Sequence, residues 1–98
     1  MKIIKEALAG TLESSDLLVK VTPLPEDRVD VVIQSEVMHQ FGEQIRQVVL
    51  ATLQQLGLIS GQVVIEDKGA LDCAIRARVQ AAILRGAAVD QLDWSKLS

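Results

Sequence analysis

Two adjacent serines in a short polar segment are the residues of this 98-residue chain that are best placed for covalent chemistry. They are Ser14 and Ser15, and they lie between two apolar stretches in the segment Gly10-Thr11-Leu12-Glu13-Ser14-Ser15-Asp16. A serine at the tip of a turn is exposed, so another enzyme can reach its hydroxyl. The segment holds no histidine or lysine that could activate a serine as a nucleophile. It therefore indicates either an ordinary turn or an attachment point for a group that a dedicated transferase adds.

The other reactive side chains of the chain are few. His39 is the one histidine, and we expect it to be a solvated helix residue because no partner for acid–base work is evident. Cys73 is the one cysteine, which excludes an internal disulfide, and we expect it to be a small buried apolar residue. No spacing of cysteines, histidines and carboxylates resembles a metal site. We therefore predict no catalytic residue and no metal ligand.

Composition excludes several further classes of function. The formal net charge is -3 and no cluster of lysines and arginines dominates, so we expect no nucleic-acid partner. Phe41 and Trp94 are the only aromatic residues, which argues against a platform for stacking bases. No signal peptide and no run as long as a membrane span is visible. We expect one cytoplasmic domain over residues 1–98, with no membrane association.

Three segments are predicted to be strands from their alternating, β-branched pattern: residues 17–22, 29–34 and 62–66. The first ten residues are ambiguous. Ile3, Ile4, Ala7 and Leu8 fit one helical face, whereas Leu8, Gly10 and Leu12 fit one face of a strand. We prefer a strand because residues 17–21 need a partner. The prediction is a hairpin with residues 13–16 at its tip.

Two helices are predicted from apolar residues at three- and four-residue spacing. The first covers residues 36–56, with Ser35 as N-cap and Gly57 just past its end. Its apolar stripe is Val37, Phe41, Ile45, Val48, Val49, Leu53 and Leu56. The second covers residues 70–85, with Gly86 as its stop and Leu71, Ile75, Val79, Ala82 and Ile83 as its core stripe. Residues from about 87 onward are expected to form a loose tail in which Trp94 docks.

These elements together predict an α+β fold. We expect a mostly antiparallel sheet, made of the N-terminal hairpin plus two further strands, with both helices packed on one face. The second helix carries Arg76 and Arg78. They form either a solvated face, stabilised by an Asp72–Arg76 pair, or a docking surface for an anionic group.

Three sequence blocks, in order and together spanning nearly the whole chain, resemble the acyl carrier subunit (gamma chain) of citrate lyase. The first is Ala9-Gly10-Thr11-Leu12-Glu13-Ser14, which precedes a polar pair and an apolar strand. The second is Gln40-Phe41-Gly42, followed by a long helix. The third is Asp67-Lys68-Gly69-Ala70-Leu71-Asp72-Cys73 with the following Arg76-Ala77-Arg78, and the tail adds a similar Leu92-Asp93-Trp94. Each block alone is weak, but three in the right order and spacing are specific.

The resemblance implies a covalent carrier that breaks no bonds itself. In that family the serine matching Ser14 carries 2′-(5″-phosphoribosyl)-3′-dephospho-coenzyme A through a phosphodiester bond. The thiol at the far end of this arm holds acetyl and citryl groups as thioesters. The arm carries them between the two catalytic subunits while citrate is cleaved to acetate and oxaloacetate. The choice of Ser14 over Ser15 rests on the resemblance.

The resemblance also implies partners. They are the alpha (transferase) and beta (lyase) subunits of citrate lyase, a prosthetic-group transferase, and an acetate ligase that acts on the arm thiol. Lys68, Arg76 and Arg78 are candidates for a surface that docks on these subunits or meets the phosphates of the arm. The alternative is a small regulatory or assembly module of α+β fold with no covalent group.

Overall fold

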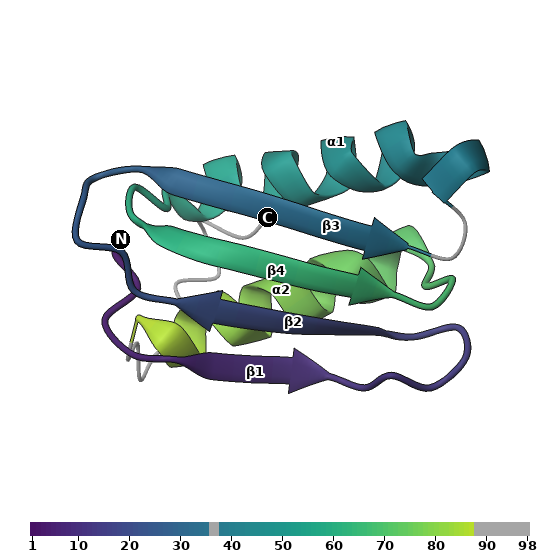
Figure 1. Cartoon of the computed structure of the whole chain (residues 1–98), viewed down its shortest axis with the longest axis horizontal. Coiled ribbons are helices and arrows are strands. Elements are labelled where there is room, and N and C mark those ends of the chain that lie inside the picture. Colours follow the sequence, from purple (N-terminus) through teal and green to yellow (C-terminus); the bar gives the residue numbers. More distant parts are fainter. Residues whose placement is uncertain (36–37, 88–98) are drawn as a thin grey trace.

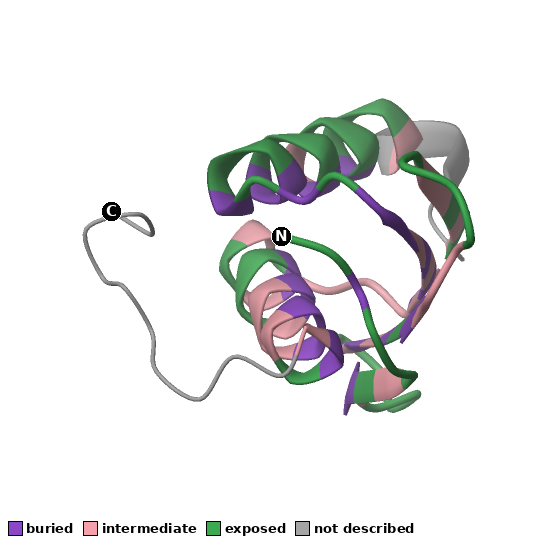
Figure 2. Cartoon of the chain, turned by 90° about the vertical axis from the view of Figure 1, so that its left-hand side faces the viewer, coloured by how far each residue is buried: buried purple, intermediate pink, exposed green. Residues whose placement is uncertain are grey.

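The structure is a computed structural model that describes residues 1–35 and 38–87 and, for residues 38–41, the backbone alone. Two helices pack against one face of a four-stranded sheet (Figure 1; Figure 2). This confirms the predicted α+β class. The elements in chain order are β1 (Ala7–Gly10), β2 (Leu17–Thr22), β3 (Val29–Ser35), α1 (Met38–Leu56), β4 (Gly61–Asp67) and α2 (Asp72–Gly86).

The sheet has the strand order β1-β2-β4-β3. β2 pairs antiparallel with both β1 and β4, so the sheet is mostly antiparallel as expected. β3 and β4 are parallel, which makes the sheet mixed. The parallel pair arises because α1 connects these two strands and returns the chain to the end of the sheet where β3 began.

The core lies between the sheet and the two helices. Alternate residues of β2 point into it, and Leu17, Val19 and Val21 are fully buried. The antiparallel register sets Val19 opposite Ile65 and Val21 opposite Val63. The helices complete the core with Ile45, Val49, Leu53 and Leu56 from α1 and Ile75, Val79, Ala82 and Ile83 from α2.

The N-terminal hairpin is confirmed, since β1 pairs with β2 from Ala7↔Val21 to Gly10↔Leu18. The side chains of β1 that contact the core are those of Ala7 and Ala9. Leu8 and Leu12 are about half exposed and face away from the core. Alanines are found on the inner face because α2 packs against β1 and a small side chain leaves room for the helix.

The helix ends differ in part from the prediction. Gly57 follows α1 with a φ of 72°, and the Leu58 N–H donates to Leu53 O at 3.2 Å, so this end is as expected. α2 begins at Asp72, two residues later than predicted, and its N-cap Leu71 is 73% exposed. The placement of Leu71 in the core was therefore wrong.

Gly86 ends α2 as predicted, and it also has a role in packing. It is the last residue of the helix and is buried. A Cβ added there would lie 2.6 Å from Val21 Cγ2 and 3.2 Å from the Lys5 carbonyl oxygen. The absence of a side chain lets α2 lie directly on β2 and on the N-terminal segment.

The predicted start of the first helix at residue 36 and the tail with Trp94 lie outside the described residues. Ser35 ends β3, and its hydroxyl donates to Asp67 Oδ2 at 2.8 Å. Among the described residues, neither helix is long and apolar enough to cross a bilayer.

We expect Gly86→Val to lower the free energy of unfolding by about 2 kcal/mol, because the new methyl groups overpack the contact with Val21. The measurement is urea unfolding followed by far-UV circular dichroism. Ala77→Val on the exposed side of the same helix is the control and should cost about 0.5 kcal/mol, the difference in helix propensity. Equal losses in the two variants would contradict this account of Gly86.

Candidate functional site

The two serines occupy the middle of a β-turn in the loop between β1 and β2. The Asp16 N–H donates to the Glu13 carbonyl oxygen at 3.2 Å, which places Ser14 at the second position and Ser15 at the third. Ser15 has a φ of 64°, the sign that a type II turn requires at its third position. Both serines are exposed. The predicted exposed tip is confirmed.

The two serines differ in how they are held. The Ser15 N–H donates to the Lys68 carbonyl oxygen at 2.8 Å, so its backbone is fixed to the loop after β4. Ser14 forms no hydrogen bond with any residue that the structure describes. Its hydroxyl is therefore exposed and unengaged on a turn whose next residue is anchored.

The Asp16 carboxylate fixes the shape of the turn. It accepts hydrogen bonds from the Thr11 hydroxyl at 2.7 Å, from the Leu17 N–H at 2.8 Å, and from Nε and Nη2 of Arg78 at 3.3 and 3.2 Å. The Thr11 bond, then the Leu17 bond and then Arg78 lower the pKa of Asp16, against the opposing effect of desolvation. One charged group thus joins both ends of the loop to helix α2.

Gly10 is required where the strand turns into the loop. Its φ is 95°, and a Cβ at this position would lie 1.9 Å from the Leu17 carbonyl oxygen and 3.3 Å from Arg78 Cδ. That carbonyl accepts the Thr11 N–H at 3.0 Å. The glycine therefore lets the first loop residue close onto β2 and lets the arginine reach across.

The loop after β4 is built on a second buried carboxylate. Asp67 is 2% exposed and accepts bonds from the Ser35 hydroxyl, the Gly69 N–H and the Ala70 N–H. Lys68 then faces the serine loop, since its N–H donates to the Asp16 carbonyl oxygen at 2.8 Å. Asp67 thereby holds a loop that supports the serine turn, five residues before α2 begins.

The candidate docking cations lie in different settings. Arg78 is bound to Asp16, with its side chain still 43% exposed. Arg76 is exposed, and its side chain forms no hydrogen bond or ion pair with the described residues. The Asp72 carboxylate, expected to pair with Arg76, accepts from Gln44 Nε2. Lys68 is half-buried and contributes its backbone to the serine loop.

Two residues of the site had no role in the sequence interpretation. Thr11 and Asp16 were part of the polar segment, yet only the serines between them were considered. A threonine and an aspartate that flank a short turn commonly bond to the backbone within it, and that pattern was the available signal.

Cys73 was expected to be buried but is exposed, because α2 turns Ile75 and Val79 toward the core and Cys73 away from it.

Among the described residues, no group of three histidines, cysteines or acids could hold a metal ion. The side chains of His39, Gln40 and Phe41, and so most of the second sequence block, lie outside the described part of the chain.

The first and third sequence blocks meet at one place. The loop of residues 10–16 is held by Lys68 and Arg78 of the third block.

We expect Asp16→Asn to lower the free energy of unfolding by about 1 kcal/mol at pH 7, because the loop loses its charged acceptor. Folding lowers the pKa of Asp16, so its contribution is complete above the ordinary aspartate pKa of about 3.9 and is lost as the pH falls through the lower pKa of the folded state. The difference between wild type and variant should therefore shrink on acidification. Urea unfolding at a series of pH values measures it.

The control for this prediction is Asp30→Asn. Asp30 pairs with Arg28 at 3.3 Å, and both side chains are well exposed, so this change should alter stability by only a few tenths of a kcal/mol. A difference between wild type and Asp16→Asn that stays constant from neutral to acid pH would contradict the assignment.

Comparison with known proteins gives the family. Residues 4–86 match the family model described as "Malonate decarboxylase delta subunit (MdcD)". The fold is shared with a crystal structure of a Pseudomonas malonate decarboxylase hetero-tetramer in complex with malonate. The TM-score is 0.76 over 87% of each chain, at 19% identity.

Curated relatives match over the full length. The citrate lyase acyl carrier protein of Albidiferax ferrireducens is 63% identical over 99% of both chains. That of Pectobacterium atrosepticum is 60% identical over 99% of this chain and 100% of its own, and that of Vibrio cholerae is 54% identical over the whole of both. The exposed serine turn, held by two of the blocks that resemble this family, thus lies in a chain that belongs to the citrate lyase acyl carrier proteins.

Proposed function

We propose that this chain is the acyl carrier subunit of citrate lyase and that its prosthetic group is attached to Ser14. The proposed group is 2′-(5″-phosphoribosyl)-3′-dephospho-coenzyme A, joined to Ser14 Oγ by a phosphodiester. The observation that carries the proposal is the state of this hydroxyl, which is exposed and without a hydrogen bond to the described residues. A group added there displaces no packed side chain and breaks no bond within that part of the chain.

The surroundings of Ser14 favour attachment over catalysis. The loop contains no histidine or lysine, and no described side chain hydrogen-bonds the hydroxyl as a general base would. The proton of the hydroxyl is therefore removed by the enzyme that attaches the group. Ser15 is the poorer site, because its backbone is bound to Lys68 and holds a positive φ.

The attached arm supplies a thiol that carries acetyl and citryl groups as thioesters between the transferase and lyase subunits. The contribution of this chain is a fixed base for that arm. Asp16, Arg78 and Lys68 hold the turn to the rest of the fold. Tethering replaces a diffusional encounter by an effective concentration that is on the order of millimolar for short flexible linkers. The chain itself contributes no group to bond breaking.

The proposed partners are the alpha and beta subunits of citrate lyase, a prosthetic-group transferase and an acetate ligase. Lys68, Arg76 and Arg78 are candidates for their recognition. Arg76 is the best of them, since it is exposed on α2 and is not bound to any described residue. Arg78 serves the turn itself through Asp16, and Lys68 supports it with its backbone. The cytoplasmic location expected from the sequence stays a prediction.

We expect Ser14→Ala to abolish both loading and acyl transfer while changing the free energy of unfolding by less than about 0.5 kcal/mol, because the hydroxyl is unengaged. The chain is co-produced with the attaching enzymes, its intact mass is measured, and a peptide map locates the added group. Ser15→Ala is the matched control and should still be loaded.

Loading at Ser15 would leave the carrier role intact and refute the site. An active complex in which no serine is modified would refute the carrier role. That result would favour the alternative, a small assembly or regulatory module without a covalent group.

We expect Arg76→Glu to weaken association with the partner subunits by a few-fold, mainly through a slower and less salt-dependent on-rate, because an exposed charge acts on encounter. Arg46→Glu on the exposed side of α1 is the control and should bind as wild type. Surface plasmon resonance at two salt concentrations measures both. Equal rates for wild type and Arg76→Glu would exclude Arg76 from the docking surface.

A further inference from the structure

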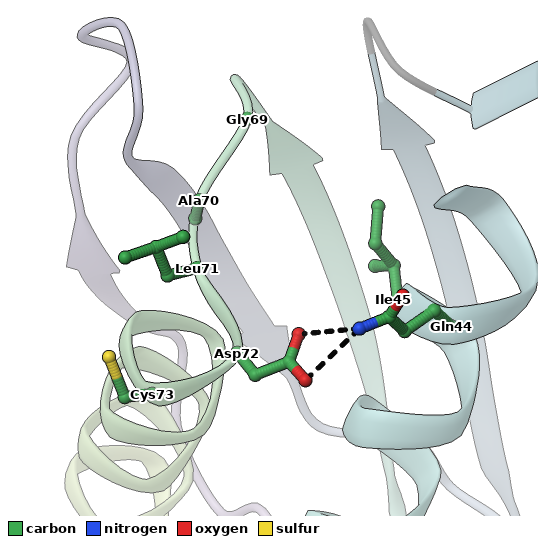
Figure 3. A pocket seen from close by; sticks show the side chains of 7 residues that line it. All are labelled: Gln44, Ile45, Gly69, Ala70, Leu71, Asp72 and Cys73. Carbon is green, nitrogen blue, oxygen red and sulfur yellow. Dashed lines mark hydrogen bonds between the residues drawn. The ribbon is translucent and has the colours of Figure 1, made fainter. Parts of the chain in front are cut away.

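A cavity of about 560 Å³ opens between helix α1 and the loop that leads into α2 (Figure 3). Gln44 and Ile45 line it from α1, and residues 69–73 line it from the other side. Its volume is within the range of small-molecule sites, about 300–1,000 Å³. No function considered so far uses this cavity.

The wall is mainly apolar, with one polar pair. Ile45, Ala70, Leu71 and Cys73 provide the apolar part. The polar pair is Gln44 and Asp72, whose side chains point toward each other across the gap, with Nε2 3.2 and 3.4 Å from the two carboxylate oxygens (Figure 3). A ligand that fits this wall is mainly apolar and carries a few hydrogen-bonding groups.

The cavity adjoins the attachment site through the backbone. Gly69 on its wall follows Lys68, and the Lys68 backbone is bonded to Ser15 and Asp16 in both directions at 2.8 Å. The loop with Ser14 and the loop after β4 lie at the same end of the molecule, at the right of Figure 1. A cavity wall and an attachment serine are thus parts of one hydrogen-bonded unit.

Gly69 lies on this side of the cavity. It has a φ of 92°, a conformation that favours glycine, and a Cβ built there would meet nothing within 4 Å. Leu71, the most exposed of the large apolar side chains described, stands beside it on the same wall. An apolar ligand in the cavity would remove this exposed side chain from water, and that burial would stabilise the complex.

We propose that this cavity is the resting site for the distal, thiol-bearing part of the arm attached to Ser14. The inference rests on the proposed function. A coenzyme A-type arm consists of methylene groups interrupted by amides and ends in a thiol, which matches an apolar wall that carries the Gln44–Asp72 pair. Resting there shields the apolar part of the arm from water between its visits to the two subunits.

Cys73 makes the inference testable without an activity assay. Cys73 lies on the cavity wall. Because it is the one cysteine of the chain, the loaded chain has two thiols, that of Cys73 and that of the arm. Diamide takes one hydrogen from each thiol and joins the sulfurs in a disulfide, which forms only when the sulfurs meet. We expect rapid crosslinking within one loaded chain, seen as a loss of two hydrogens in the intact mass and a joined pair of peptides containing Ser14 and Cys73.

Two matched variants separate a bound arm from a merely tethered one. Leu71→Asp puts a charge on the cavity rim, and the fold tolerates it because aspartate is a favoured N-cap. We expect it to slow crosslinking about tenfold, which corresponds to a resting preference of about 1.4 kcal/mol. Leu8→Asp changes an exposed leucine of β1, outside the cavity wall, and should crosslink as wild type.

Amide chemical shifts give an independent measurement. Loading should shift the signals of Ile45, Gly69 and Ala70, and these shifts should be absent in Leu71→Asp. Equal crosslinking rates in the three proteins together with unshifted amides would overturn the proposal. Shifts of the same amides on removal of residues 88–98 from the unloaded chain would assign the cavity to the C-terminal segment and also overturn it. A chain with no added mass after co-production fails the proposed function instead.

Discussion

The bond between the Asp16 carboxylate and the Arg78 guanidinium joins the serine loop to the helical layer, and the geometry of the loop depends on it. Asp16 is close to β2 and Arg78 is on α2, 62 residues further along the chain. The same carboxylate accepts the Thr11 hydroxyl and the Leu17 N–H, so one charge satisfies groups at both ends of the turn. Without it, the loop would keep the backbone bonds to Lys68 and to the Leu17 carbonyl and the bonds within the turn.

The serine loop and the loop after β4 support each other. Asp67 is buried and folds the residues after β4 by accepting two backbone N–H groups, which presents the Lys68 backbone to the serine loop. The β2–β4 pairing ends at Leu17 and Asp67, and the two Lys68 bonds continue it by one more step. This arrangement leaves the Ser14 hydroxyl without a hydrogen bond to any described residue, on a turn whose backbone is fixed on either side. A carrier needs a fixed turn together with a free hydroxyl, because the base of a swinging arm must hold its place while the arm moves.

Much of the fold follows from the apolar pattern. The alternation in residues 17–22, the stripe of Ile45, Val49 and Leu53, and the stripe of Ile75 and Val79 all face the core as predicted. The errors lie where the chain leaves its regular elements. Leu71 and Cys73 were expected to be buried, but α2 begins at Asp72 and turns Ile75 and Val79 toward the core, which leaves both of them exposed. The sequence around an apolar residue at the start of a helix does not show whether another element packs against that residue and buries it.

By itself, the sequence determined the local conformations and the family. Period-two alternation and small or polar turn residues dictate the hairpin and its exposed tip, and the blocks around Ser14 and Asp67 mark an acyl carrier. The tertiary structure decided which groups meet. Arg78 could be a free docking cation or a support of the turn, and only the packing of α2 against β1 and β2 makes it the partner of Asp16. The same packing leaves Arg76 exposed and opens the cavity beside Gly69. Contacts between residues that lie far apart in the chain depend on how the layers pack, and no local pattern in the sequence encodes that.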